Sequence, residues 1–291
     1  MRHSPLTTSG PGHHKPDRDP GPVTGPGPAL PLVGVAHGSS DPRAAASVDT
    51  LLSLVRARAA AAGYPGLDVR AAYLGHAAPT LAQALSAVDG AAVVLPLLLT
   101  AAYHSKTDIP KVLHEVRRAR PRLGISYGRP LGPHPLLRRA LERRLAEAAD
   151  GEPPWASAAV PAASTTAVVL AAAGSSDPAA NAVITDQAEC WQAERGWRAV
   201  LPAYASAASP TPPEAVAAAR RSGARRVLVA SYLLCPGVFA DQIRSDCLAA
   251  GADVVSPVLG AAPEIADIVL GRYAESLTSG AVQVTDGAAA G

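Results

Sequence analysis

Several features that mark particular protein classes are scarce in this chain of 291 residues. Aromatic side chains make up only 4% of it, so its cores must be built from alanine, valine and leucine. The formal net charge is +2, which argues against a general nucleic-acid-binding protein. No apolar run reaches the roughly 18 residues of a transmembrane span, and neither of the glycine-rich nucleotide motifs is present. The sequence therefore predicts no nucleic-acid partner, no membrane insertion and no nucleotide cofactor.

Cysteine is also scarce, and the three cysteines all lie in the second half of the chain, at Cys190, Cys235 and Cys247. They lack the CxxC spacing of zinc knuckles and do not suggest a disulfide framework. Free cysteine is among the residue types most often buried in proteins. We therefore expect three buried structural thiols.

The first 30 residues are rich in proline and glycine and lack the apolar core of a signal peptide. Such a segment cannot bury enough surface to offset the entropy lost on ordering. We expect residues 1–30 to form a disordered tail and the protein to be cytoplasmic, in a reducing compartment.

Short apolar runs alternate with alanine- and arginine-rich helical stretches from residue 32 onwards. Strands separated by helices indicate βαβ units and a parallel sheet with helices on both faces. The expected strands are 32–36, 67–74, 91–99 and 124–127, and the expected helices are 41–62, 80–88, 109–118 and 136–149.

The same order of elements then returns after a break at residues 151–165, which has the composition of a linker. The expected strands of this second set are 167–172, 197–204, 226–234 and 253–256, and its helices are 178–194, 211–221, 239–250 and 262–277. The fold class predicted is α/β, with two tandem domains at 31–150 and 166–278 and a disordered tail at 279–291.

A shared turn supports this internal duplication. The sequence Gly-Ser-Ser-Asp-Pro follows the first strand of each set, at 38–42 and at 174–178. Three further strand ends and turns align in the same order, which chance matching does not readily produce. The two domains are therefore expected to be copies of one scaffold.

The copies differ in their histidines, because all eight histidines of the chain lie before residue 135. At the four aligned points the first copy carries a histidine and the second does not. These pairs are His37 with Ala173, His76 with Ala207, His104 with Val238, and His134 with Ala262. The asymmetry predicts that the first domain holds the chemistry and that this chemistry needs imidazole.

Three of these histidines, His37, His76 and His104, follow the ends of predicted parallel strands. Ligands bind at the carboxyl ends of the strands in open α/β sheets, so these imidazoles are expected at one rim. There they could hold a borderline divalent metal or take protons from a substrate. His134 lies in a Gly-Pro-His-Pro helix start, where a structural role and a place at the substrate rim remain equally open.

The Gly-Ser-Ser turn allows two further interpretations. Its backbone N–H groups open a helix and could receive a carboxylate or phosphate. Ser39 or Ser105, each near a histidine, could act as a nucleophile, although the G-x-S-x-G elbow is absent. Because the second copy keeps the serines without the histidine, turn and cap roles are the favoured interpretation.

The motifs together resemble a known family. The His-Gly-Ser of 37–39 with the Asp-Pro that follows, the His-x-x-x-Asp-Ile-Pro of 104–110, and the Gly-Pro-His-Pro of 132–135 look like those of sirohydrochlorin chelatases. These are the class II, ATP-independent chelatases of sirohaem and cobalamin biosynthesis, within porphyrin biosynthesis. The resemblance covers about residues 32–278 and includes both copies.

The resemblance implies a lyase that inserts a divalent metal, Fe²⁺ or Co²⁺ with Ni²⁺ not excluded, into the tetrapyrrole sirohydrochlorin. His37 and His104 would bind the metal and assist removal of the pyrrole N–H protons. Gly75 stands where the family often has a glutamate, and His76 follows it. Either His76 supplies a third ligand, or two histidines and water hold the metal.

The resemblance also implies how the carboxylate-rimmed substrate is held and what the second copy does. The residues expected around the substrate are Ser39, Ser40, Arg43, Tyr103, Ser105, Lys106 and His134. The second domain would form the opposite wall of a single cleft, which makes the chain a monomeric pseudo-dimer. A non-catalytic carrier of metal or tetrapyrrole is the alternative, since binding needs the same imidazoles.

Overall fold

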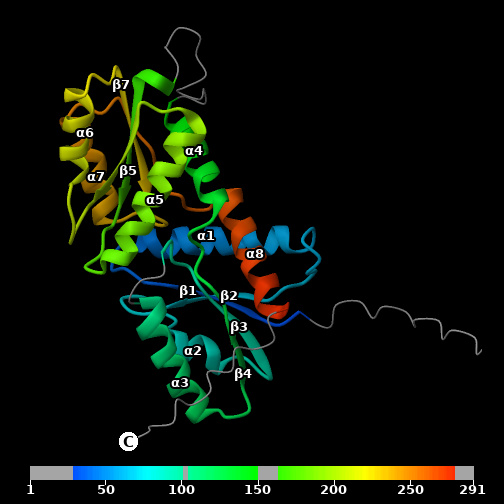
Figure 1. Cartoon of the computed structure of the whole chain (residues 1–291). Coiled ribbons are helices and arrows are strands. Elements are labelled where there is room, and N and C mark those ends of the chain that lie inside the picture. The colour runs from blue at the N-terminus through cyan, green and yellow to red at the C-terminus, as the bar shows by residue number, and fades with distance from the viewer. Residues whose placement is uncertain (1–28, 101–103, 150–162, 279–291) are drawn as a thin grey trace, which may run out of the picture.

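A computed structural model describes residues 29–100, 104–149 and 163–278, and for 104 and 105 it describes the backbone alone. Figure 1 shows two α/β units, one built around β1–β4 and one containing β5 and β7, with the long helices α1, α4 and α8 between them. Residues 1–28 of the expected tail, most of the expected linker and the tail from 279 lie outside the described residues.

The first unit contains a four-stranded parallel sheet in the order β2-β1-β3-β4. Its strands are β1 (Leu32–Ala36), β2 (Val69–Tyr73), β3 (Ala91–Pro96) and β4 (Gly124–Tyr127). Its helices are α1 (Pro42–Ala59), α2 (Leu81–Ser86), α3 (Ile109–Ala119) and α4 (Pro135–Ala148), with a π-helical turn, η1 (His104–Asp108), before α3. Every residue of β1 is buried, which is why its sequence is apolar throughout.

The second unit repeats this topology, with a parallel sheet in the order β6-β5-β7-β8. Its strands are β5 (Thr166–Ala172), β6 (Ala199–Tyr204), β7 (Arg226–Tyr232) and β8 (Val254–Val255). Its helices are α5 (Pro178–Arg195), α6 (Pro212–Arg221), α7 (Val238–Ala249) and α8 (Pro263–Thr278), after a short 3₁₀ helix, η2 (Ala163–Thr165). The predicted fold class, two tandem parallel α/β units, is confirmed.

The last helix of each unit packs against the other unit, which the sequence did not predict. Helix α4 contacts β7 and β8, whereas α8 contacts α1, β3 and β4. One continuous hydrophobic core consequently joins residues of both sheets. Two smaller cores lie on the other faces of the sheets and are confined to one unit each. Each unit therefore contributes its last helix to the hydrophobic core that covers the sheet of the other unit.

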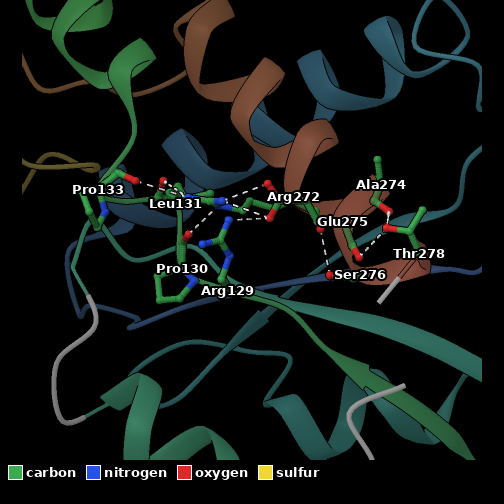
Figure 2. Close-up of polar contacts among 9 residues, drawn as sticks. All are labelled: Arg129, Pro130, Leu131, Pro133, Arg272, Ala274, Glu275, Ser276 and Thr278. Atoms are coloured by element: carbon green, nitrogen blue, oxygen red, sulfur yellow. Dashed lines mark hydrogen bonds and ion pairs between the residues drawn. The ribbon is translucent and has the colours of Figure 1, made fainter. Parts of the chain in front are cut away.

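A buried arginine fastens α8 to the first unit, as Figure 2 shows. The Arg272 side chain is 6% exposed, and its Nε donates to the Pro130 carbonyl at 2.9 Å. Its Nη2 donates to the Pro133 carbonyl at 3.3 Å, and its Nη1 pairs with Glu275 at 3.0 Å. Arg129 reaches the same carboxylate at 3.0 Å. The loop between β4 and α4 is thus held by side chains of α8.

The first described residues also pack against the core. Ala29 and Leu30 are partly buried, and the Leu30 carbonyl accepts a hydrogen bond from the Tyr273 hydroxyl at 2.8 Å. Packing therefore begins before residue 31, where the first domain was expected to start. Across the described ranges, no helix combines the length and the apolar character needed to cross a membrane.

The expectation of three buried thiols is wrong for one cysteine and only partly right for another. Cys247 is buried, but Cys190 is exposed on α5 and Cys235 is of intermediate exposure. The surrounding helix pattern places Ala188 and Trp191 on the buried face of α5 and leaves Cys190 outside it. Whether a cysteine in a helix is buried depends on which face of the helix it occupies, and the general preference of cysteine for the interior does not change that face.

Candidate active site

A cleft of about 800 Å³ lies between the two units at the carboxyl ends of their central strands. Its walls include residues 36–39 after β1 and 97–100 after β3 in the first unit. The facing wall includes residues 172–176 after β5 and 232–240 after β7. This is the edge at which open α/β sheets bind ligands, and the volume suits a large organic ligand.

His37 stands in this cleft, directly after the end of β1. It is exposed, and its Nδ1 lies 3.0 Å from the Gly38 carbonyl oxygen. A carbonyl oxygen only accepts hydrogen bonds, so in the neutral ring Nδ1 carries the proton of this contact. The lone pair is then on Nε2, which is the form an imidazole needs to bind a metal or accept a proton.

The turn after His37 is built in the same way in both units. The Ser39 hydroxyl oxygen accepts from the Asp41 backbone N–H at 3.0 Å, and Ser175 does the same for Asp177 at 3.0 Å. Gly38 adopts φ +88°, and a Cβ there would overlap the carbonyl oxygen of Gly75. The Ser39 hydroxyl thus bonds within the turn, whereas the side chain that caps α1 is that of Asp41.

The two turns differ in one side chain that the sequence analysis overlooked. In the second unit the Asn181 amide accepts from Ser175 N–H at 3.1 Å and donates to the Ser175 carbonyl at 2.7 Å. Ala45 occupies the matching position in the first unit. Among the described residues no side chain bonds the Ser39 N–H. The turn of the second unit is therefore bonded by a side chain of its own helix, which the described part of the first unit does not match.

His76 lies on the loop next to His37. The Gly75 N–H donates to the His37 carbonyl at 3.2 Å, which ties the loops after β1 and β2 together. His76 itself is exposed and has a left-handed backbone with φ 59°, as does its counterpart Ala207 with φ 60°. Ala207 lines the cleft, but His76 is not among the lining residues. The loop is therefore adjacent to the cleft, but His76 itself does not line it.

The segment expected to carry the second key histidine enters the site from β3. Leu97, Leu98, Leu99 and Thr100 line the cleft, and the backbone of His104 opens the π-helical turn that leads into α3. Ser105 belongs to the same turn. Tyr103 and the side chains of His104 and Ser105 lie outside the described part. π-helical turns inside or beside α-helices are frequent at functional sites.

His134 has a structural role in α4. Its Nδ1 accepts a hydrogen bond from the Leu136 N–H at 3.1 Å and so caps the helix. Burial lowers the pKa of His134, and the nearby Arg272 lowers it further. Both effects favour the neutral ring that the cap requires. His134 is not among the residues that line the cleft.

The two cations expected to meet the substrate already pair with carboxylates across the boundary between the units. Arg43 binds Asp41 of its own helix cap and Asp241 of α7, each at 2.6 Å. These hydrogen bonds raise the pKa of Arg43 and lower that of Asp241. Lys106 lies 3.8 Å from Asp177, the cap of α5. Ser40 is exposed and outside the cleft lining.

In the described ranges, no three His, Cys, Asp or Glu side chains gather into a group that could bind a metal ion. Cys235 lines the cleft on the second unit, whereas the sequence analysis expected a buried thiol there. Burial raises the pKa of Cys235 to about 11, although a hydrogen bond with Ser47 opposes the shift. Its thiol is therefore protonated at neutral pH, and thiolate is the form that binds metals.

The fold and the cleft together define a two-unit α/β protein with a cleft between its halves. The CbiX family model matches the chain twice, over residues 31–148 and 167–276. These matches span most of the chain, and they fall on the two repeats. The chain belongs to the CbiX family.

Curated relatives match part of the chain. A sirohydrochlorin ferrochelatase of Priestia megaterium is 29% identical over 60% of this chain and 63% of its own length. A sirohydrochlorin cobaltochelatase of the same organism is 28% identical over 52% of this chain and 47% of its own length. The chain thus spans about half to two thirds of these first relatives.

Solved structures share the whole architecture. SirB from Bacillus subtilis, determined with Fe³⁺, has a TM-score of 0.68 at 24% identity and covers 85% of this chain and 95% of its own. The cobalt complex of SirB from Bacillus subtilis subspecies spizizenii has a TM-score of 0.68 at 23% identity, over 87% of this chain and 97% of its own. At this level of identity the likeness establishes the fold.

Proposed function

We propose that the chain is a lyase that inserts Fe²⁺ or Co²⁺ into sirohydrochlorin, in sirohaem or cobalamin biosynthesis. One observation carries the proposal: His37 lines a cleft of about 800 Å³ whose facing wall has Ala173 at the matching position. The names of the curated relatives support the reaction, and the metals in the SirB structures support the choice of ions.

In this proposal His37 and His104 bind the incoming metal and accept pyrrole protons. An open set of neutral imidazoles suits the task, because the ion must be released to the ring nitrogens rather than retained. His76 supplies a third ligand by rotating from the adjoining loop, which the bond from Gly75 N–H to the His37 carbonyl keeps close. No nucleotide takes part.

Substrate carboxylates are received by the Ser39 and Ser40 turn, by Arg43 and Lys106, and by Tyr103 and Ser105. Arg43 and Lys106 first have to exchange Asp241 and Asp177 for substrate carboxylates. Such an exchange costs little, because both ion pairs are largely exposed to solvent. A carboxylate-rimmed macrocycle can therefore replace the protein's own carboxylates at the cleft mouth.

The second unit acts as the built-in opposite wall, so the chain works as a monomeric pseudo-dimer in the cytoplasm. Its Tyr232 hydroxyl donates to the Leu99 carbonyl of the first unit at 3.2 Å, which joins the walls at the base of the cleft. A homodimer is not needed to complete the site.

The test is a metal-insertion assay with purified protein, sirohydrochlorin and Fe²⁺, Co²⁺ or Ni²⁺ in parallel. We expect Fe²⁺ or Co²⁺ to change the absorption spectrum of the macrocycle faster with protein than in the metal-only control. Tight binding of the macrocycle without acceleration would instead assign the chain as a carrier. Acceleration that survives His37→Ala but not Ser39→Ala would contradict the histidine mechanism.

A further inference from the structure

The wall of the cleft on the second unit carries an exposed apolar pair that no step above uses. Val238 is 75% exposed and Phe239 is 42% exposed, and both line the cleft. Phe239 is the only phenylalanine of the chain. Scattered exposed apolar residues are ordinary, but two adjacent ones at the mouth of a concave site mark a binding surface.

The pattern of α7 explains why Phe239 meets the cleft. Ile243 and Cys247 follow it at four-residue spacing on the same stripe of the helix, and both are buried in the core of the second unit. The first turn of α7 carries this stripe on into the cleft, where Phe239 lines the wall. The described core thus covers this stripe at Ile243 and Cys247, whereas Phe239 in the first turn of α7 stays partly exposed.

The matching position on the other wall has the opposite chemistry. Val238 begins α7, and its counterpart His104 begins the π-helical turn before α3. At this position the first unit therefore carries a histidine, and the second carries an aliphatic residue that an aromatic one follows. A flat ligand between them would have its reacting centre on one side and an apolar support on the other.

We propose that Val238 and Phe239 form an apolar platform that positions the face of the macrocycle against the histidine wall. This inference rests on the proposed function and names positioning residues for it. The occupant is a planar tetrapyrrole, because its ring face is apolar and aromatic while its carboxylates lie at the rim. Aromatic and aliphatic side chains stabilise such a face by burial and stacking.

The test compares variants of the full-length chain by KM for sirohydrochlorin, by kcat with Co²⁺, and by macrocycle binding without metal. We expect Phe239→Ala to raise KM and the metal-free Kd about tenfold and to change kcat less than twofold. Phe239→Leu should recover most of the affinity, because it restores apolar area. The double variant with Val238→Ala should bind more weakly than either single variant.

Leu248→Ala is the matched control, because Leu248 also lies on α7 and is 44% exposed but does not line the cleft. It should leave KM, Kd and kcat unchanged. A Phe239→Ala protein that keeps the wild-type Kd, or a Leu248→Ala protein with an equal loss, would overturn the platform. Wild-type protein that binds the macrocycle without inserting metal would overturn only the lyase activity, whereas wild-type protein that binds none would overturn both.

Discussion

The two halves of this chain share a backbone topology and differ in the side chains at matching positions. Both have the sheet order 2-1-3-4 in their own strands, the same Gly-Ser-Ser-Asp-Pro turn and the same left-handed residue after the second strand. The first half adds His37 to that turn, and the second half adds Asn181. Among the described side chains, Asn181 closes the turn of the second half, and none closes the turn of the first half.

This difference distinguishes residues that the fold requires from residues that only the proposed reaction requires. The shared glycine is required in both halves, since a Cβ at Gly38 or Gly174 would overlap a backbone carbonyl. The histidine is required in neither half for folding, because the second half forms the same turn without it. The second unit keeps the scaffold but has alanine in place of the histidine, so it forms one wall of the cleft without supplying the imidazole.

Separating the halves should have the largest effect. A chain that ends at residue 162 lacks α8, whose Ile265, Ile268, Val269 and Tyr273 are buried in the shared core. Four such side chains contribute roughly 6–12 kcal/mol, comparable to the whole stability of a domain. We expect no cooperative unfolding of this fragment by circular dichroism.

Adding residues 163–291 as a second polypeptide should restore α8 and with it the cooperative transition. A fragment that unfolds alone with the melting temperature of the full chain would show that the exchanged helix is dispensable. The two halves would then be independent domains rather than parts of one core.

Closing the open turn, or opening the closed one, should have an intermediate effect. Asn181→Ala removes two hydrogen bonds to Ser175 and should lower the free energy of unfolding by about 1–2 kcal/mol in urea titrations. Ala45→Asn should leave stability unchanged or higher but raise KM for sirohydrochlorin, because the new amide occupies the Ser39 N–H. An unchanged KM for Ala45→Asn would exclude that N–H from substrate binding.

The smallest effect is expected at His134, a histidine of the first half that serves structure. Its pKa is lowered in the folded protein, so the unfolded state binds its proton more readily. The stability from this cap is complete above pH about 6.5 and is lost as pH falls below that value. Glu275 opposes the shift, and Arg129 and Arg272 add to it.

The variant His134→Asn offers an amide oxygen in place of Nδ1 as the acceptor for Leu136 N–H and does not titrate in this range. We expect it to unfold at pH 5.5 with less loss of stability, relative to pH 7.5, than the wild type shows. His134→Ala should lose about 1 kcal/mol at pH 7.5. Equal pH dependence of the wild type and His134→Asn would remove His134 from the account.

Much of the fold was predictable, because apolar runs of strand length alternate with helical stretches twice in the same order. The bounds of β4 at Gly124–Tyr127 agree with the prediction. The strand expected at 91–99 ends at Pro96, since Leu97 to Leu99 turn into the cleft lining. A run of apolar letters does not distinguish a strand from the wall of an apolar cleft.

The packing of α4 and α8 on the sheet of the other unit was not predictable. A hydrophobic stripe shows that a helix is buried, but not which sheet it covers. At the site, His37 was predictable, because it follows the end of a predicted strand and the second half has Ala173 at the matching position. Asn181 shows in the sequence only as a mismatch with Ala45, which becomes informative once the turn geometry is known. Phe239 carries no motif, and its place depends on where α7 begins relative to the cleft.

The central claim is that a single cleft works through the histidine of the first half. The direct measurement is the initial rate of Co²⁺ insertion into sirohydrochlorin by His37→Ala and Ala173→His, beside the wild type. We expect His37→Ala to lose at least about a hundredfold in rate with its melting temperature unchanged, in line with the usual contribution of a general base. Ala173→His should stay within about twofold of the wild type by the same criterion. Wild-type activity in His37→Ala, or rescue of that variant by Ala173→His, would contradict the claim.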